Sequence, residues 1–179
     1  MGKRSSFERK PRDYYPTPID AVKPLIPHLP ENFCFAEPCA GDGRLVEHLV
    51  YLTDNKAIPT LISDIEPLGD NISEADVFDV TVPEETDYII TNPPWDRKIL
   101  HPLIMHLCSQ KPTWLLFDAN WMFTKQASDY LKYCEKIVTI GRVKWIEDSK
   151  MTGKDDSCWY LFTPNPIAKP IFFGKNISS

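Results

Sequence analysis

The chain has 179 residues, of which 42% are hydrophobic, and this fits one globular domain with little room for a second. Its formal charge is −5, so the molecule as a whole does not attract nucleic acid electrostatically. No apolar stretch approaches the ~20 residues that cross a bilayer, and the N-terminus lacks the apolar core of a signal peptide. The composition predicts a soluble intracellular protein and excludes a membrane-spanning one.

The charge is unevenly distributed along the chain. Residues 1–12 carry a local charge of +4, which leaves −9 for residues 13–179. We expect residues 1–12 to form a flexible basic tail, which is either simply solvated or in contact with a polyanion. A single domain over residues 13–166 and a C-terminal tail over 167–179 complete the expected organisation.

The cysteines and histidines show no spacing typical of a metal site. None of the five cysteines forms a Cys-x-x-Cys pair, and all of them fall in or beside apolar runs. This pattern is typical of reduced, buried thiols in a cytosolic protein. The four histidines also lack ligand spacing. The sequence therefore predicts neither a disulfide nor a metal site.

Short apolar strands alternate with helices along the chain. The first helix is expected after Thr17 as its N-cap, and Pro24 and Pro27 shorten or kink it. Strands are expected at 33–37, 60–65, 87–91, 113–118, 136–146 and 158–163, and further helices at 44–52, 98–108 and 124–133. The last two strands can pair as a hairpin. This order predicts an α/β, doubly wound fold with a mostly parallel sheet.

Three expected strand ends or loops carry residues suited to a nucleotide-like ligand, and such ligands bind beyond the carboxyl ends of the strands. Gly41 and Gly43 let backbone N–H groups approach a ligand at a helix N-terminus. Asp64 is placed to hold two ribose hydroxyls, and Asp76 beside Val77 can bond an amine while an apolar side chain packs on a ring. Taken singly, a helix-entry turn and exposed acids explain these residues equally well.

Residues 92–95 read Asn-Pro-Pro-Trp and directly follow an apolar strand. The two prolines donate no backbone hydrogen bond and hold φ near −65°, so the strand ends there. An amide, outward-pointing carbonyls and a flat ring remain on a stiff turn, which can bond an amino group and stack a planar ring together. A proline-rich strand stop with a packing tryptophan is the alternative for this turn alone.

Taken in order, four motifs resemble those of the class I S-adenosylmethionine-dependent amino-methyltransferases. The motifs are Glu37-Pro-Cys-Ala-Gly-Asp-Gly, Ser63-Asp-Ile-Glu-Pro, Ala75-Asp and Thr91-Asn-Pro-Pro-Trp. They most resemble the small N6-adenine DNA methyltransferases of phages and bacteria, over roughly residues 14–163. The resemblance implies a Rossmann-like, seven-stranded, mostly parallel sheet with a C-terminal antiparallel hairpin. It also implies S-adenosyl-L-methionine as cofactor, DNA as partner, and the cytoplasm of a bacterial or phage-infected cell.

The resemblance assigns roles to individual residues. It implies cofactor contacts by Tyr15, Thr17, Pro18, Glu37, Ala40, Gly41, Gly43, Asp64, Asp76 and Val77. Glu66 is an alternative to Asp64 as the ribose ligand. It implies a catalytic turn of Asn92, Pro93, Pro94 and Trp95, with Trp95 stacking the target base and Trp159 or Tyr160 as a second aromatic wall. Lys98, Lys150 and Lys154 are further candidates for contacts to the substrate.

The chain departs from the family where a target-recognition region is expected. Only residues 164–179 follow the last expected strand, and residues 64–76 are too few for the usual helix. Base readout would then come from residues 147–156, the basic tail, Arg97 and Lys98, or a partner. This predicts weak sequence preference.

Other acceptors and one role without catalysis remain open. Adenine N6 in RNA and a protein glutamine fit the same turn, and an inactive cofactor-binding partner subunit is the alternative without catalysis. A dehydrogenase is disfavoured because the glycine-containing loop lacks the third glycine of the dinucleotide fingerprint.

Overall fold

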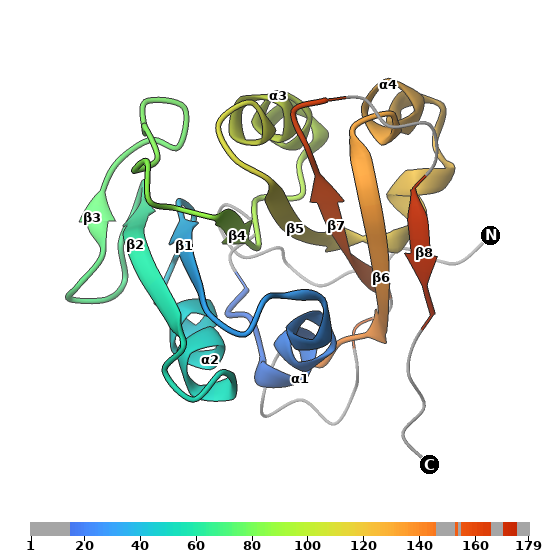
Figure 1. The fold of residues 1–179 in the computed structure, drawn as a ribbon. Helices are drawn as coiled ribbons and strands as arrows, with labels where there is room; N and C mark the ends of the chain where they lie inside the picture. The colour runs from blue at the N-terminus through green and yellow to red at the C-terminus, as the bar shows by residue number, and fades with distance from the viewer. Residues whose placement is uncertain (1–14, 146–152, 154, 166–169, 175–179) are drawn as a thin grey trace, which may run out of the picture.

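The computed structural model describes residues 15–145, 153, 155–165 and 170–174 (Figure 1). Its strands are β1 (Phe33–Glu37), β2 (Ala57–Asp64), β3 (Ser73–Glu74), β4 (Tyr88–Thr91), β5 (Thr113–Asp118), β6 (Cys134–Arg142), β7 (Asp156–Phe162) and β8 (Ile171–Phe173). Its α-helices are α1 (Ile19–Val22), α2 (Arg44–Leu52), α3 (Arg97–Cys108) and α4 (Ser128–Leu131). Short 3₁₀ helices are η2 (Lys23–His28), η3 (Ala119–Phe123) and η4 (Lys125–Ala127).

The eight strands form one sheet in the order β3-β2-β1-β4-β5-β7-β6-β8. Strands β3, β2, β1, β4 and β5 are parallel to one another, whereas β7 is antiparallel to both of its neighbours. The α/β fold and the antiparallel hairpin of β6 and β7 are therefore confirmed. The expected count of seven strands was one short, and Ile171–Phe173 pairs with β6 inside the segment expected to be a tail.

Two apolar layers cover the sheet, as a doubly wound fold requires. One core packs α1, η2 and α2 against side chains such as Phe35 and Trp159. The other packs α3 and the segment after β5 against side chains such as Phe117 and Tyr160. Figure 1 shows these two groups of helices on opposite faces of the sheet. Because both faces are covered, the central strands are almost continuously apolar.

Several expected elements differ from the observed ones, each for a local reason. Thr17 does not cap the first helix, whose N-cap position is Pro18 without a side-chain hydrogen bond. The strand expected over 136–146 runs instead from Cys134 to Arg142, with an irregularity between Thr139 and Gly141, whose φ is 82°, after which the ladder continues to Arg142. The helix expected over 124–133 is instead η4 followed by the single turn of α4.

Across the residues that the structure describes, no helix combines the length and the apolar character that crossing a membrane requires. Among the same residues, no three His, Cys, Asp or Glu side chains gather closely enough to ligate a metal ion. All five cysteines are free thiols; three are buried, but Cys34 and Cys39 are partly exposed, contrary to the expectation that all would be buried.

Candidate active site at the carboxyl ends of the strands

The loop after β1 is folded tightly against the end of β2. The N–H of Ala40 donates to the carbonyl of Ser63 at 2.9 Å, and the N–H of Gly43 donates to the carbonyl of Ala40 at 2.8 Å. Gly41 and Gly43 have φ values of 56° and 85°, in the left-handed region that glycine adopts most easily. Gly43 is also the N-cap of α2, so the free N–H groups of this helix begin at the loop.

Glu37 ends β1 beneath this loop and is buried. The backbone N–H of Val46, in the first turn of α2, donates a hydrogen bond to its carboxyl group. Oε2 of the same group has no partner among the described residues. Burial raises the pKa of Glu37 well above its usual range, and the nearby Asp64 and Asp42 add to the increase. A buried carboxyl with one unsatisfied oxygen is ready to bond a donor supplied by a ligand.

Asp64 ends β2, and its carboxylate connects the loop after β1 with the loop after β2. Its Oδ2 accepts from the N–H of Gly41 and its Oδ1 from the N–H of Glu66, both at 2.8 Å. Each carboxylate oxygen can accept a second hydrogen, so these bonds fix the group and leave acceptor capacity. Glu66 is exposed and lies two residues further along the chain. Asp64 is the last residue of β2 and Glu66 follows it closely. The two backbone hydrogen bonds to its carboxylate give Asp64 the more rigid position.

Asp76 and Val77 lie on the segment that runs alongside the end of β2. Asp76 is exposed, and its Oδ1 accepts from the N–H of Phe78 at 3.0 Å. Val77 is buried in the core that packs against α3. The N–H of Ala75 donates to the carbonyl of Asp64 at 2.9 Å, which brings Asp76 to the same sheet edge as Asp64.

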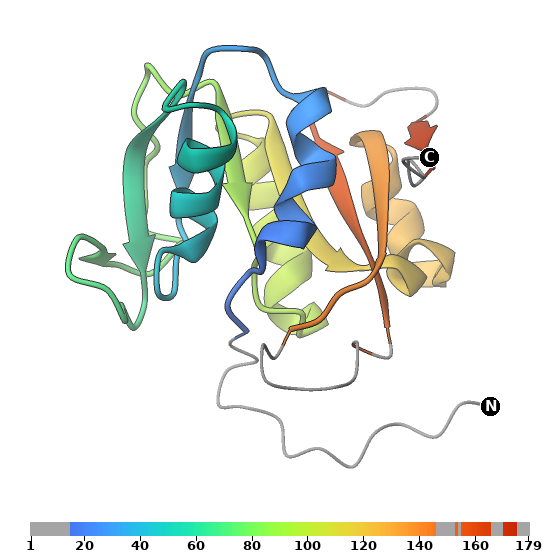
Figure 2. The ribbon, with the colours of Figure 1, turned by 90° about the horizontal axis from the view of Figure 1, so that it is seen from below.

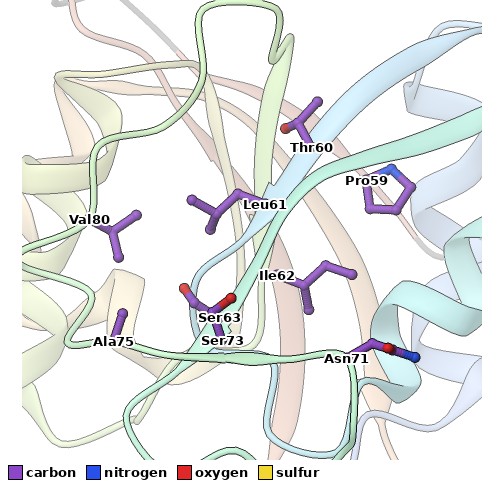
Figure 3. A pocket seen from close by; sticks show the side chains of 9 residues that line it. All are labelled: Pro59, Thr60, Leu61, Ile62, Ser63, Asn71, Ser73, Ala75 and Val80. Carbon is purple, nitrogen blue, oxygen red and sulfur yellow. The ribbon is translucent and has the colours of Figure 1, made fainter.

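A cavity of about 450 Å³ follows the open edge of β2 (Figure 3). Its lining residues are Pro59, Thr60, Leu61, Ile62, Ser63, Asn71, Ser73, Ala75 and Val80. It exists because the short connection from β2 to β3 forms no helix over this edge. None of its lining residues belongs to the 92–95 turn. Ser63 and Ala75 are the chain neighbours of Asp64 and Asp76, so the cavity adjoins the acidic side of the site.

The Asn92 side chain is held from several directions at the end of β4. Its Nδ2 donates to the carbonyl of Tyr15 at 3.4 Å and to Oγ1 of Thr17 at 3.2 Å. Its Oδ1 accepts from Nε1 of Trp95 at 3.2 Å. These contacts fix the amide plane and use one of the two lone pairs of Oδ1. The N-terminal segment and the 92–95 turn, about 75 residues apart in sequence, therefore meet as the resemblance implies.

Trp95 packs inward rather than standing free. Its ring N–H lies 3.2 Å both from Oδ1 of Asn92 and from the carbonyl of Leu116 on β5. The ring is half-buried against the core beneath α3. In Figure 2 the arrowheads of the parallel strands point toward the end of the sheet at which this turn lies. Pro93 is buried and Pro94 is half-buried, which makes the turn stiff.

Trp145 completes an aromatic cluster that the sequence analysis missed. It lies edge-on to Trp95, with ring centroids 5.7 Å apart and planes at 84°, and its centroid lies 6.5 Å from that of Tyr15. It is half-buried, so part of the ring faces solvent. Residue 145 was expected inside a strand, but β6 ends at Arg142.

The structure contradicts the base-stacking role expected for Trp159. This residue is fully buried, and its Nε1 donates to the carbonyl of Ala21 at 2.8 Å on the α1 side of the sheet. Tyr160, the alternative, is also fully buried, with its hydroxyl bonded to the carbonyl of Asp118. Both positions are on a central strand covered on both faces, which sequence periodicity alone did not reveal. Lys98 is exposed on α3, and Lys150 and Lys154 lie outside the described residues.

Comparison with known proteins adds the fold class. No family model matches the sequence, and no curated protein does either. A putative RNA methyltransferase from Pyrococcus horikoshii has a similar structure, with a TM-score of 0.57 and 16% identity over 91% of this chain and 94% of that one. A putative class I S-adenosylmethionine-dependent methyltransferase from Listeria monocytogenes has a TM-score of 0.56 and 10% identity over 87% of this chain.

A modification subunit of a putative type I restriction enzyme from Vibrio vulnificus is similar too, with a TM-score of 0.57 and 10% identity over 93% of this chain. The chain spans 62% of the Listeria protein and 48% of the Vibrio subunit. At these identities the likeness is one of fold. The chain has the Rossmann-like fold of class I methyltransferases.

Proposed function

We propose that this protein transfers a methyl group from S-adenosyl-L-methionine to an exocyclic amino group, with N6 of adenine in DNA as the leading acceptor. The observation that carries the proposal is the Asn92 amide, held at the end of β4 with acceptor capacity left on its oxygen. A strand-end amide of this kind suits an acceptor that presents N–H groups.

The residues at the ends of β1 and β2 fit such a cofactor. The unpartnered Oε2 of Glu37 suits the ammonium group of its methionine part, because a buried acceptor gains most from a charged donor. Asp64 has acceptor capacity for two ribose hydroxyls, and the exposed carboxylate of Asp76 suits an aromatic amine. Gly41 and Gly43 let the backbone approach closely. When bound, the cofactor supplies a methyl group made electrophilic by a positively charged sulfur.

The protein's contribution to the reaction is positioning. An exocyclic amine is a poor nucleophile because its lone pair is delocalised into the ring. Hydrogen bonds from its two N–H groups to Oδ1 of Asn92 and to the carbonyl of Pro93 would favour a pyramidal nitrogen with a more available lone pair. Neither acceptor takes up a proton near neutral pH, so the proton displaced by methylation passes to water. Alignment alone can contribute about 7–11 kcal/mol to such a transfer.

Three aromatic side chains provide the wall that a planar acceptor needs. Trp145 and Trp95 are perpendicular, and Tyr15 lies beside them above the same turn. Stacking on such rings is worth about 1–3 kcal/mol per base, comparable with the few kcal/mol that base extrusion from a duplex costs. We assign to Trp145 the stacking role first expected for Trp159.

The direct test is transfer of a labelled methyl group to defined acceptors. The purified chain is incubated with labelled S-adenosylmethionine and, separately, DNA, RNA or a glutamine-containing peptide pool. Label on adenine N6 of DNA that depends on Asn92 supports the proposal. Label on RNA or on peptide glutamine replaces the acceptor, cofactor binding without any transfer favours the inactive partner subunit, and no cofactor binding refutes the proposal.

A further inference from the structure

Charge is divided between the two sides of the fold. Between Lys56 and Arg97 the chain has ten acidic residues and no lysine or arginine. This stretch forms β3 and β2, at one edge of the sheet, and β4, which lies beside β5 in its interior, together with their connections. Residues 97–145, which form α3 to β6, contain eight basic residues and three acidic ones. Figure 1 shows the two stretches on opposite sides of the molecule, and the 92–95 turn lies at their boundary.

Basic side chains surround the turn on the second side. Arg97 and Lys98 begin α3, immediately after the turn, and both are exposed. Lys144 precedes Trp145, which contacts Trp95, and the lysine side chain is exposed. Lys125 begins η4 and is exposed as well. Within the ranges that the structure describes, none of the three lysines has an ion-pair partner.

An exposed aromatic ring lies in the same neighbourhood. Phe123 is 81% exposed, more than any other large hydrophobic residue in the described part of the chain. It ends η3, three positions before Gln126, and Oε1 of Gln126 accepts from the guanidinium group of Arg97 at 3.2 Å. That bond fastens the segment of Phe123 and Lys125 to the first turn of α3. Trp121, in the same short helix as Phe123, is buried in the core and holds this segment in place.

We propose that Arg97, Lys98, Phe123, Lys125 and Lys144 form a platform that binds a single-stranded nucleic acid segment next to the acceptor base. The cations contact phosphates, and Phe123 stacks a base that flanks the acceptor. Basic grooves with exposed aromatic rings bind single strands in this way. The platform rests on the proposed function and deepens it, because it selects nucleic acid over a peptide as the carrier of the acceptor. A polyanion is attracted to this side and repelled by the acidic side.

Binding of a short labelled strand tests the platform apart from catalysis. Fluorescence anisotropy of the full chain is measured with a 12-nucleotide single strand that contains one adenine, as DNA and as RNA. We expect Phe123→Ala to weaken binding roughly 5- to 100-fold, and Phe123→Tyr to bind within about twofold of the parent, because stacking needs only a ring. Tyr51→Ala is the matched control, since Tyr51 is an aromatic residue 74% exposed at the end of α2. It is expected to bind as the parent does.

The salt dependence of binding tests the cations. Lys125→Ala is expected to reduce the slope of log affinity against log salt by about one, because one phosphate contact is lost. Lys56→Ala removes the same charge at an ion pair with Glu31 and is expected to leave the slope unchanged. Equal losses in the platform variants and their controls would overturn the platform, and so would parent-like binding by Phe123→Ala.

The outcomes separate the platform from the proposed function. If the parent chain methylates DNA or RNA and Phe123→Ala has the same KM for the strand, the platform is wrong and the function stands. If the strands bind through Phe123 and Lys125 but no nucleic acid is methylated, the platform stands and the function is wrong. Methylation of a peptide glutamine without strand binding would overturn the platform and replace the acceptor of the proposed function.

Discussion

The site has two sides that are built in different ways. On the cofactor side, at the ends of β1 and β2, carboxyl groups are held mainly by backbone N–H groups close in sequence, such as Gly41 to Asp64 across 23 positions. On the acceptor side, at the ends of β4 and β5, an amide and aromatic rings are held by segments far apart, such as Asn92 to Tyr15 across 77 positions. The first side is acidic and suits a cationic cofactor, whereas the second is aromatic and basic.

The two sides therefore depend to different degrees on local sequence motifs and on tertiary contacts. A tight loop with glycines specifies its own geometry, because few side-chain choices intervene between sequence and backbone. The acceptor side needs the N-terminal segment and residues 143–145 to converge on the turn. If the two sides are separable, each variant should change either the affinity for the cofactor or the kinetics with the acceptor, but not both equally.

Asn92→Ala should have the largest effect, and mainly on transfer to the acceptor. Loss of the amide oxygen removes an acceptor that the proposed transition state needs, and such losses cost about 10²–10³ in kcat, or about 3–4 kcal/mol. Cofactor affinity, measured by calorimetry, should fall less than kcat does, although the amide also holds Tyr15 and Thr17, which the resemblance assigns to the cofactor. Asn120→Ala, an exposed amide after β5, is the control. Equal loss of cofactor binding and transfer would mean that the sides are not separable.

Glu37→Gln should weaken cofactor binding by about 1–3 kcal/mol, because the amide cannot become the carboxylate that would pair with the ammonium group of the cofactor. The exposed Glu74→Gln is the control.

The same variant changes the pH dependence of stability. Burial raises the folded pKa of Glu37 above the ordinary 4.5, so between the two values the folded chain keeps a proton that the unfolded chain has lost. The free energy of unfolding contributed by this group is present below pH 4.5 and decreases as pH rises to the folded pKa. Chemical denaturation across this range should show a flatter decrease for Glu37→Gln. An unchanged slope would place the proton elsewhere.

Trp145→Ala should raise the KM for the acceptor, because one stacking surface is lost. The expected cost is about 1–3 kcal/mol in kcat/KM, with cofactor affinity unchanged. Trp145→Phe keeps a ring and should recover most of the activity. If Trp145→Ala leaves the KM unchanged, the aromatic wall is formed by other residues.

Trp95→Phe should have the smallest effect. The ring remains, but the indole N–H no longer donates to Asn92 and Leu116, which costs about 1 kcal/mol, or roughly fivefold in kcat. The acceptor KM should change little, since the stacking surface is kept. A rise in the KM for the acceptor without a change in kcat would instead assign Trp95 to acceptor binding rather than to orientation of the Asn92 amide.

Local sequence was sufficient to predict the α/β class, the strand that ends at Glu37, the helix from Arg44 to Leu52 and the 92–95 turn. These features depend on local chemistry: apolar runs, glycines with positive φ, and prolines that stop a ladder. The hairpin of β6 and β7 was predictable for a similar reason, because two β-rich runs flank one polar loop.

Which of Trp145 and Trp159 lies beside the 92–95 turn depends on the tertiary structure. Trp145 and Trp159 both lie near the ends of apolar runs, and nothing in their local sequence ranks them. The antiparallel pairing of β7 between β5 and β6 buries Trp159 completely, while β6 ends at Arg142 and Trp145 lies beside Trp95. Contacts between segments far apart in sequence depend on the assembled sheet, which local sequence does not encode.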